Sequence, residues 1–485
     1  MRCGNRATAA ASLAAAAFLS LPGAACAHAF GQRYDLPAPL GYFVAGAAAA
    51  VALSFVVAAA FMRRAPRSDR DPRVILPLGP LLPALQLALQ FLSVVLLCAV
   101  VAAGFIGNRN PEMNLAPILV WIVWWVGVAF LVVCIGNVWA ALDPWRALFE
   151  GLDTLARRCG ATNGISRGRP YPQRLGMWPA VAFLLAFVWI EVVYPRSAVP
   201  SHVAWFALAW SAVTLSGMIC FGGETWRRNS DVFAIYFGTL ARFAPLDIGP
   251  DRRSVVLRPP GRGLITGEAV SYGMVGFVLA MLSTVMFDGL LGTQAMTIAH
   301  AALADWVTLH PLAGGYVLGT AGIVGVWLVF LAAYLLACAA TARLVHDRSA
   351  GAIARLFVLT LVPIAIAYLI AHYLHYLLVQ GQLIVPLLSD PFGRRWDLLG
   401  TASFYPDIGL LDARLVWNLS LASIVAGHVI SIWLAHRIAL REFGARGMAV
   451  KASVALTVLM VVYTVVSLLI IADPLVQYGV AREGN

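Results

Sequence analysis

Residues 83–106 read PALQLALQFLSVVLLCAVVAAGFI and contain no charged side chain. A helix needs about 20 mostly apolar residues to cross the hydrocarbon core of a bilayer, and this run is long enough. A helix also satisfies its backbone N–H and C=O groups within the segment, as a bilayer requires. The stretch therefore predicts a transmembrane helix, and similar runs recur along the chain.

The composition of the whole chain agrees with that stretch. Of 485 residues, 61% are hydrophobic and only 12% are charged, and the mean hydropathy is +0.82. Charged residues make up about a quarter of an ordinary soluble domain, so this chain has too few to cover a water-facing surface. The composition excludes a soluble enzyme, a disordered chain and a nucleic-acid-binding protein. It predicts an all-α, polytopic membrane protein whose main partner is the lipid bilayer.

Hydrophobic periodicity and length predict about ten transmembrane helices in a single helical domain, residues 40–485. The predicted spans are residues 40–62, 83–106, 117–138, 175–194, 202–221, 268–287, 314–340, 352–380, 415–435 and 452–471.

Positive charges are distributed unevenly between the loops. The chain has 34 Lys and Arg against 23 Asp and Glu. Most of the basic residues follow the first, third, fifth, seventh and ninth predicted spans. Because loops rich in Lys and Arg stay in the cytoplasm, we expect both termini outside it. The net charge of +11 therefore needs no nucleic-acid partner.

The N-terminus has the pattern of a cleaved secretory signal peptide. Arginines precede an Ala-rich apolar run, and small residues follow it. Cleavage after Ala27 removes residues 1–27 and leaves a short periplasmic segment, residues 28–39. His28 would then be the first residue and a candidate Cu²⁺ ligand, whereas cleavage after Ala29 would remove it.

Four segments outside the spans have distinct features. Residues 138–155 and 231–243 mix aromatic and apolar residues with charges, so they predict amphipathic helices lying on the cytoplasmic surface. Residues 288–313 and 383–414 are long loops on the opposite, periplasmic side. Long ordered loops on one side of a protein often shape a site.

Ionisable side chains within the predicted spans are few, and each is a functional candidate because charge is costly in a bilayer. Glu191 lies in the outer third of the fourth span, and Asp288 closes the sixth at its outer end. His372 and His375 lie in the outer half of the eighth span, and His428 lies near the middle of the ninth. The predicted topology places all five in the outer half of the membrane or at its centre.

The histidines have a spacing that suits a shared ion. His372 and His375 are three residues apart, so they project about 60° apart on one helical face. Pro363 is expected to kink the same span below the pair. Gly427 carries no side chain beside His428, so another helix can approach closely there.

With Asp288, these three histidines form a candidate site for Zn²⁺, Mn²⁺ or Co²⁺ with an open position. Such a metal lowers the pKa of bound water toward about 7, and Glu191 or Asp288 is the candidate catalytic acid–base group. Two other interpretations stay open: a polar network that packs helices, and a path for protons or ions.

A set of short segments, in order along nearly the whole chain, resembles a bacterial membrane-protein family known as fenitrothion hydrolase. They are HAFGQRYDLP (28–37), DPW (143–145), FGGETW (221–226), FDGL (287–290), LVPI (361–364), AHY (371–373), GQ (381–382), SDPFG (389–393) and GHV (427–429).

The resemblance implies hydrolysis of lipophilic organophosphorus triesters, such as aryl phosphorothioates, in a bacterial inner membrane. It transfers no catalytic set, so the residues above carry the mechanism: metal-activated water attacks phosphorus at a site facing the periplasm. The alternative function is an ion, proton or metal transporter, or another metal-handling membrane protein, in which hydrolysis is absent or incidental. A third is a scaffold without a substrate.

Overall fold

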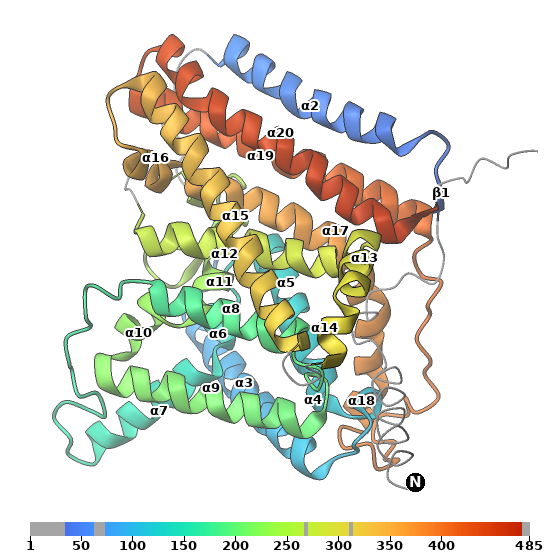
Figure 1. The fold of residues 1–485 in the computed structure, drawn as a ribbon. Helices are drawn as coiled ribbons and strands as arrows, with labels where there is room; N and C mark the ends of the chain where they lie inside the picture. The colour runs from blue at the N-terminus through green and yellow to red at the C-terminus, as the bar shows by residue number, and fades with distance from the viewer. Residues whose placement is uncertain (1–33, 63–72, 266–269, 310–313, 478–485) are drawn as a thin grey trace, which may run out of the picture.

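The computed structural model describes residues 34–62, 73–265, 270–309 and 314–477. Helices make up most of these residues, so the predicted all-α fold is confirmed (Figure 1). Within the described part of the chain, nine helices are long and apolar enough to cross a membrane. The predicted signal peptide and His28 lie outside the described residues.

The nine candidate spans include seven continuous helices and two composite ones. The continuous helices are α2 (Leu40–Phe61), α3 (Leu81–Ile106), α9 (Pro200–Phe221), α12 (Tyr272–Leu291), α15 (Gly314–Val345), α19 (Ala413–Phe443) and α20 (Arg446–Leu475). One composite span joins α4 (Leu115–Pro117), η3 (Ile118–Gly127) and α5 (Val128–Cys134). The other joins α16 (Ala350–Phe357), η5 (Val358–Leu361), α17 (Val362–Gln380), η6 (Gly381–Leu383) and α18 (Ile384–Ser389).

Shorter helices and strands connect or cover the spans. The helices are η2 (Pro111–Met113), α6 (Trp139–Leu142), α7 (Pro144–Arg158), α8 (Trp178–Val192), α10 (Gly223–Asn229), α11 (Val232–Ala241), η4 (Arg262–Leu264), α13 (Gln294–Ala302) and α14 (Ala304–Leu309). Strands β2 (Arg73–Pro77), β4 (Ser254–Leu257) and β3 (Leu246–Ile248) form an antiparallel sheet in that order. Strand β1 (Tyr34–Asp35) pairs in parallel with β5 (Val476–Gln477).

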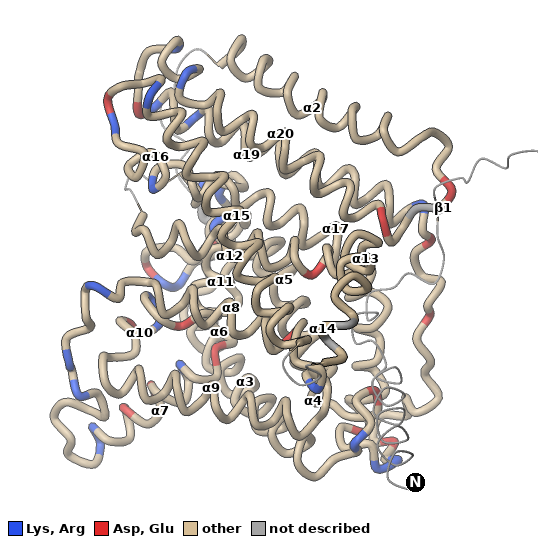
Figure 2. Tube along the Cα trace, viewed as in Figure 1, with Lys and Arg blue, Asp and Glu red and all other residues tan. Residues whose placement is uncertain are grey.

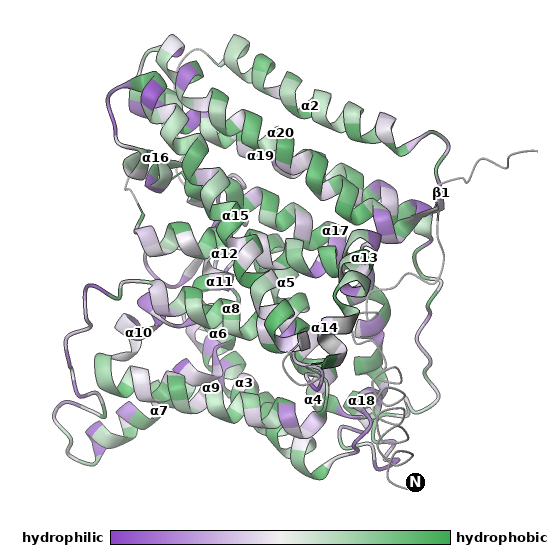
Figure 3. Ribbon diagram, in the orientation of Figure 1, coloured by the Kyte–Doolittle hydropathy of each residue, from purple (hydrophilic) through white to green (hydrophobic). Residues whose placement is uncertain are grey.

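The helices differ in how deeply they are buried. Helices α12 and α17 are buried along most of their length, whereas α2 and α3 expose apolar side chains along theirs. Figure 3 shows apolar residues along the helices of the bundle, and Figure 2 shows most Lys and Arg at the end that carries α7, α10 and α16. The core of the fold therefore lies around α12 and α17, while apolar residues on the periphery suit lipid. The orientation across the membrane stays a prediction.

Two spans depart from regular α-helix where they approach the centre. The segment η3 is a π-helix of 10 residues, a geometry that often occurs at functional positions. The eighth predicted span changes to a 3₁₀ turn at η5, which ends two residues before Pro363. Proline removes a backbone donor, and the Ser431 hydroxyl of α19 donates to the Thr360 carbonyl there. The structure therefore has a short 3₁₀ segment next to Pro363, and the kink expected there stays a prediction.

Three predictions about individual segments differ from the structure. The fourth predicted span is α8, which has only 15 residues and is shorter than a typical span. Residues 231–243 do not lie on a surface, because α11 is buried against α5, α6, α8 and α10. The loop 288–313 is largely helical, since it contains the last turn of α12 followed by α13 and α14.

Gly427 lets α19 pack closely on α17. A Cβ atom there would lie 2.7 Å from the Pro363 carbonyl oxygen and would overlap Ala367. We expect Gly427→Ala to lower the free energy of unfolding by about 1–3 kcal/mol, because an added methyl group overpacks a close contact. Unfolding in detergent by SDS titration measures this.

The matched control is Gly325→Ala in the middle of α15, where a Cβ atom meets nothing within 4 Å. Alanine is favoured over glycine within a helix by about 0.5–1 kcal/mol, so this variant should be neutral or slightly more stable. Equal stability of the two variants would contradict the close approach at Gly427.

Candidate functional site

Asp288 on α12 and His372 on α17 meet within the helical core. His372 Nε2 lies 3.0 Å from Asp288 Oδ2, and the Tyr373 hydroxyl donates to the same oxygen at 2.7 Å. The side chains of His372 and Asp288 are only 13% and 9% exposed. Two of the predicted site residues therefore form a buried acid–imidazole pair, and Tyr373 joins it as a third member.

Aromatic rings fix the His372 side chain from two sides. The Tyr368 ring lies at an angle of 30° to the imidazole with centroids 6.1 Å apart, and the Tyr373 ring meets it edge-on at 4.6 Å. Gly289, next to Asp288, leaves room for Tyr368, whose hydroxyl would lie 2.6 Å from a Cβ atom at that position. The glycine and the two tyrosines thus hold the imidazole against the carboxylate.

Glu191 reaches the same region from α8. It lines a small cavity with Trp125, Tyr236, Tyr373 and residues of α12 and α17. The cavity has room for about one water molecule. Tyr373 therefore borders the cavity and also bonds Asp288, so polar groups continue from Glu191 to His372. We call Glu191, Tyr236, Asp288, His372 and Tyr373 the Asp288 cluster.

The other two histidines lie apart from this cluster. His375 lines a second small cavity against α19, with Ser420 and apolar residues. His428 is fully buried, and its Nδ1 lies 2.8 Å from the Ile424 carbonyl of its own helix. Although His375 shares a helix with His372, its different angle on that helix directs it to other neighbours.

The predicted metal-ligand set is not assembled. Among the residues that the structure describes, no group of three or more His, Cys, Asp or Glu side chains is arranged to hold a metal ion. The donors near Asp288 therefore do not fit the site for Zn²⁺, Mn²⁺ or Co²⁺ expected from the sequence, which stays a prediction.

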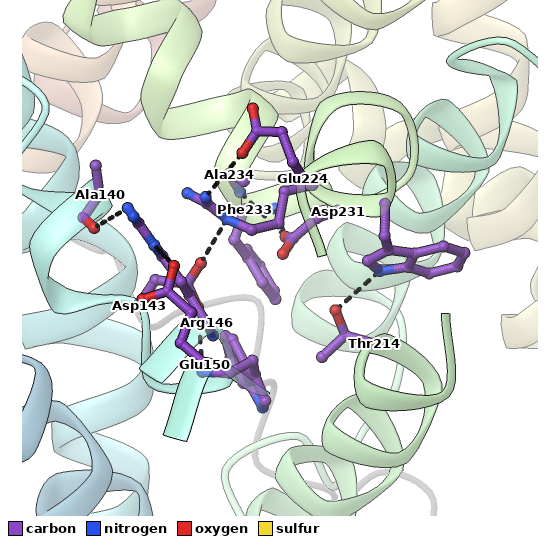
Figure 4. Close-up of polar contacts among 12 residues, drawn as sticks. Ala140, Asp143, Arg146, Glu150, Thr214, Glu224, Asp231, Phe233 and Ala234 are labelled. Carbon is purple, nitrogen blue, oxygen red and sulfur yellow. Dashed lines mark hydrogen bonds and ion pairs between the residues drawn. The ribbon is translucent and has the colours of Figure 1, made fainter. Parts of the chain in front are cut away.

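A second group of charged residues is buried where α6, α7, α10 and α11 meet (Figure 4). Asp143 and Asp231 are 0% exposed. The Arg227 Nε atom donates to Asp143 Oδ2 at 3.1 Å, and Arg227 is 15% exposed. Near them, Arg146 bonds the exposed Glu150, and Arg227 also lies 3.6 Å from Glu224. We call Asp143, Arg227 and Asp231 the Arg227 cluster.

Both aspartates of the Arg227 cluster cap helices. Asp143 Oδ1 accepts from the backbone N–H groups of Trp145 and Arg146 at the start of α7. Asp231 Oδ1 accepts from those of Phe233 and Ala234 at the start of α11. Carboxylates at these positions satisfy donors that a helix leaves free, which explains why the chain places Asp there.

The second carboxylate oxygens, Oδ2, of these two aspartates differ in their hydrogen bonding. Asp143 Oδ2 accepts from Arg227, whereas Asp231 Oδ2 is buried without a hydrogen-bond partner in the described structure. Burial, and then the charge of Asp143, raises the pKa of the Asp231 carboxyl to about 7. Burial also raises the pKa of Asp143, although the charge of Arg227 opposes that effect. Burial therefore raises the pKa of both aspartates, and the pKa of Asp231 lies near neutral pH.

Aromatic side chains lie between the Arg227 cluster and the Asp288 cluster. The Phe233 ring stacks on Trp145 at 5.9 Å, beside Asp143, and contacts Trp124 at 4.6 Å. It also contacts Trp125 at 6.4 Å, and Trp125 lines the Glu191 cavity. Trp210 and Phe187 complete the group. We call Trp124, Trp125, Trp145, Phe187, Trp210 and Phe233 the aromatic layer.

Sequence reasoning identified Glu191, Asp288 and His372 but missed the Arg227 cluster. Asp143 precedes Pro144, and Asp231 precedes an apolar run; both are typical N-terminal caps of helices. That signal predicts two helix starts but not their burial, since the capped helices were interpreted as lying on the surface.

Comparison with known proteins adds nothing to this geometry. No protein-family model, curated protein or solved structure matches the chain. The resemblance to the fenitrothion hydrolase family therefore stays a prediction.

Proposed function

We propose that the protein moves protons through its helical core, with the Asp288 cluster as the proton-binding site. The observation that carries this proposal is the Asp288 carboxylate, which bonds both His372 and Tyr373, while Tyr373 and Glu191 line the same water-sized cavity. Ionisable groups within a membrane-spanning bundle are costly and typically serve ion or proton pathways.

The arrangement suits proton transfer better than binding of a large molecule. Carboxylate, phenol and imidazole groups each exchange a proton. Asp288, His372 and Tyr373 are linked by direct hydrogen bonds, and Tyr373 shares a water-sized cavity with Glu191. The cavity is far smaller than the pockets that enclose drug-sized ligands. A network that merely packs helices would not need a second carboxylate, Glu191, beside the cavity that Tyr373 also lines.

Proteoliposomes with an imposed pH gradient test the proposal. The purified protein should dissipate the gradient, measured with a pH-sensitive dye, faster than empty liposomes do. His372→Gln keeps a hydrogen-bonding side chain next to Asp288 but does not titrate, so we expect proton flux to fall at least tenfold. The control is His300→Gln on α13, because His300 is exposed and outside the cluster. Wild-type flux equal to that of empty liposomes would reject the proposal.

A second candidate function is hydrolysis of a lipophilic organophosphorus triester, as the sequence resemblance implies. The observation that favours it is the His372–Asp288 pair, because a carboxylate that orients and stabilises an imidazole is a common general-base arrangement. His372 would take a proton from water, the water oxygen would bond to phosphorus, and the aryloxide would leave. The bilayer would supply the lipophilic substrate. No step depends on a metal, since the donors do not fit one.

Release of nitrophenolate from an aryl phosphorothioate by the detergent-purified protein distinguishes the two functions. Hydrolysis that is lost in His372→Gln, in a protein that conducts no protons, would favour the hydrolase. A chelator tests the predicted Zn²⁺, Mn²⁺ or Co²⁺ in the same assay. Proton flux without hydrolysis would favour the first proposal.

A further inference from the structure

The charges of the Arg227 cluster do not balance when both aspartates are ionised. Asp143 and Asp231 are fully buried, and Arg227 is the basic group bonded within the cluster. Arg146 bonds Glu150 and the Ala140 carbonyl, while Glu224 is exposed and Tyr171 bonds Ser230. Two buried carboxylates facing one guanidinium leave one negative charge uncompensated, which is strongly unfavourable away from water.

The hydrogen bonds indicate which aspartate carries the excess charge. The guanidinium of Arg227 donates to Asp143. Asp231 uses Oδ1 to cap α11, and its Oδ2 atom, buried and without a partner in the described structure, accepts nothing. Addition of a proton to Oδ2 changes the charge of this carboxyl from −1 to 0 and makes the cluster neutral. A bound proton at Asp231 therefore resolves the imbalance.

Helix α11 connects this position to the Asp288 cluster. Asp231 caps its first turn, Phe233 belongs to the aromatic layer, and Tyr236 lines the cavity with Glu191. The Tyr236 ring packs on Trp125 with centroids 4.6 Å apart. One short, buried helix thus carries a titratable group on one side of the aromatic layer and a cavity-lining phenol on the other.

We propose that Asp231 is a second proton-binding site, separated from the Asp288 cluster by the aromatic layer and serving the same proton pathway. This inference depends on the proposed function for its role in the pathway, but the binding of a proton at Asp231 does not. The aromatic layer provides no titratable side chain between the two sites. A proton that passes between the two sites would therefore need water between these rings.

Infrared difference spectroscopy of the purified protein tests the site directly. A protonated carboxylic acid has a C=O stretching band that a carboxylate lacks, and we expect a band that titrates near pH 7 in the wild type. Asp231→Asn should remove this band and keep the fold, because Asn caps helices about as well as Asp does. Asp231→Ser is a second variant that keeps a capping oxygen. Asp347→Asn, at an exposed turn residue, is the control. An unchanged band in both Asp231 variants would overturn the site.

The pH dependence of stability provides a second measurement. The folded chain holds a proton on Asp231 up to about pH 7, whereas the unfolded chain releases it near the ordinary pKa of 3.8. The unfolded state therefore binds fewer protons between these values, so wild-type stability should fall as pH rises from about 4 to 7 and then level off. Asp231→Asn should remove this part of the decrease, whereas a slope identical to that of the wild type would contradict proton binding at Asp231.

Proton flux in liposomes tests whether proton binding at Asp231 contributes to proton conduction. If Asp231 serves the pathway, Asp231→Asn should lower flux at least tenfold, while Asp347→Asn should not change it. Loss of the infrared band with unchanged flux would overturn the role of Asp231 in the pathway. If wild-type protein shows the titrating band but conducts no protons, the proposed function fails and the proton-binding site stands.

Discussion

Replacing Asp288 with Asn should reduce proton flux in liposomes to the level of empty vesicles, a decrease of at least tenfold. Asp288 Oδ2 holds His372 at 3.0 Å and accepts from Tyr373 at 2.7 Å. Asn retains an oxygen that can accept from Tyr373, but it carries no charge and releases no proton. The variant therefore breaks the connection between Tyr373 and His372 as a proton path while it preserves most of the packing.

The control for this variant must separate loss of function from loss of fold. Asp347→Asn makes the same chemical change at an exposed turn residue and should leave flux unchanged. Hydrogen bonds to charged groups contribute about 1.5–3 kcal/mol each, so Asp288→Asn should lower stability by a comparable amount without unfolding the protein. A folded Asp288→Asn variant with wild-type flux would exclude Asp288 from the proton pathway.

The helical spans were predictable because their signal is local. The run before Ile106 has no charge and matches α3 at its end, and Leu40 begins both the first predicted span and α2. Where the predicted location of a helix differs from the structure, packing against other helices is the cause. Residues 231–243 carry charges only near their ends, at Asp231 and Arg242, and were expected to form a surface helix, yet α11 is covered on nearly all sides by its neighbours. The sequence pattern of a helix does not show how many other helices pack against it.

The candidate site was predictable only in part, for the same reason. The cost of charge in a bilayer identified Glu191, Asp288 and His372. It did not identify Tyr373, because tyrosine is common in membrane spans. Only the structure shows that the Tyr373 hydroxyl lies 2.7 Å from the Asp288 carboxylate. His375 and His428 satisfied the same rule, but His375 lines a separate cavity against α19 and His428 bonds a carbonyl of α19 itself. The residue types identified candidate site residues, and the contacts between helices show which of these residues lie together.

Arg227→Met should lower the free energy of unfolding by about 3–5 kcal/mol at pH 8, the range found when one partner of a buried ion pair is removed. Arg227 is 15% exposed and Asp143 is 0% exposed, so the change leaves a buried carboxylate without its counter-charge. At pH 5 the effect should be smaller, because the pKa of Asp143 rises further without Arg227 and the group then becomes neutral. SDS titration in detergent at both pH values measures this.

Two further variants distinguish charge from packing. Arg157→Met removes an exposed partner, since Arg157 and Asp153 are 54% and 18% exposed, and it should cost less than about 1 kcal/mol. The double variant Asp143→Asn with Arg227→Met should recover much of the lost stability, because Asn keeps the cap of α7 and position 143 no longer carries an unpaired charge. If the double variant is as unstable as Arg227→Met alone, the Arg227 side chain stabilises the protein by packing. The charge balance that makes Asp231 a proton site would then lose its main physical support.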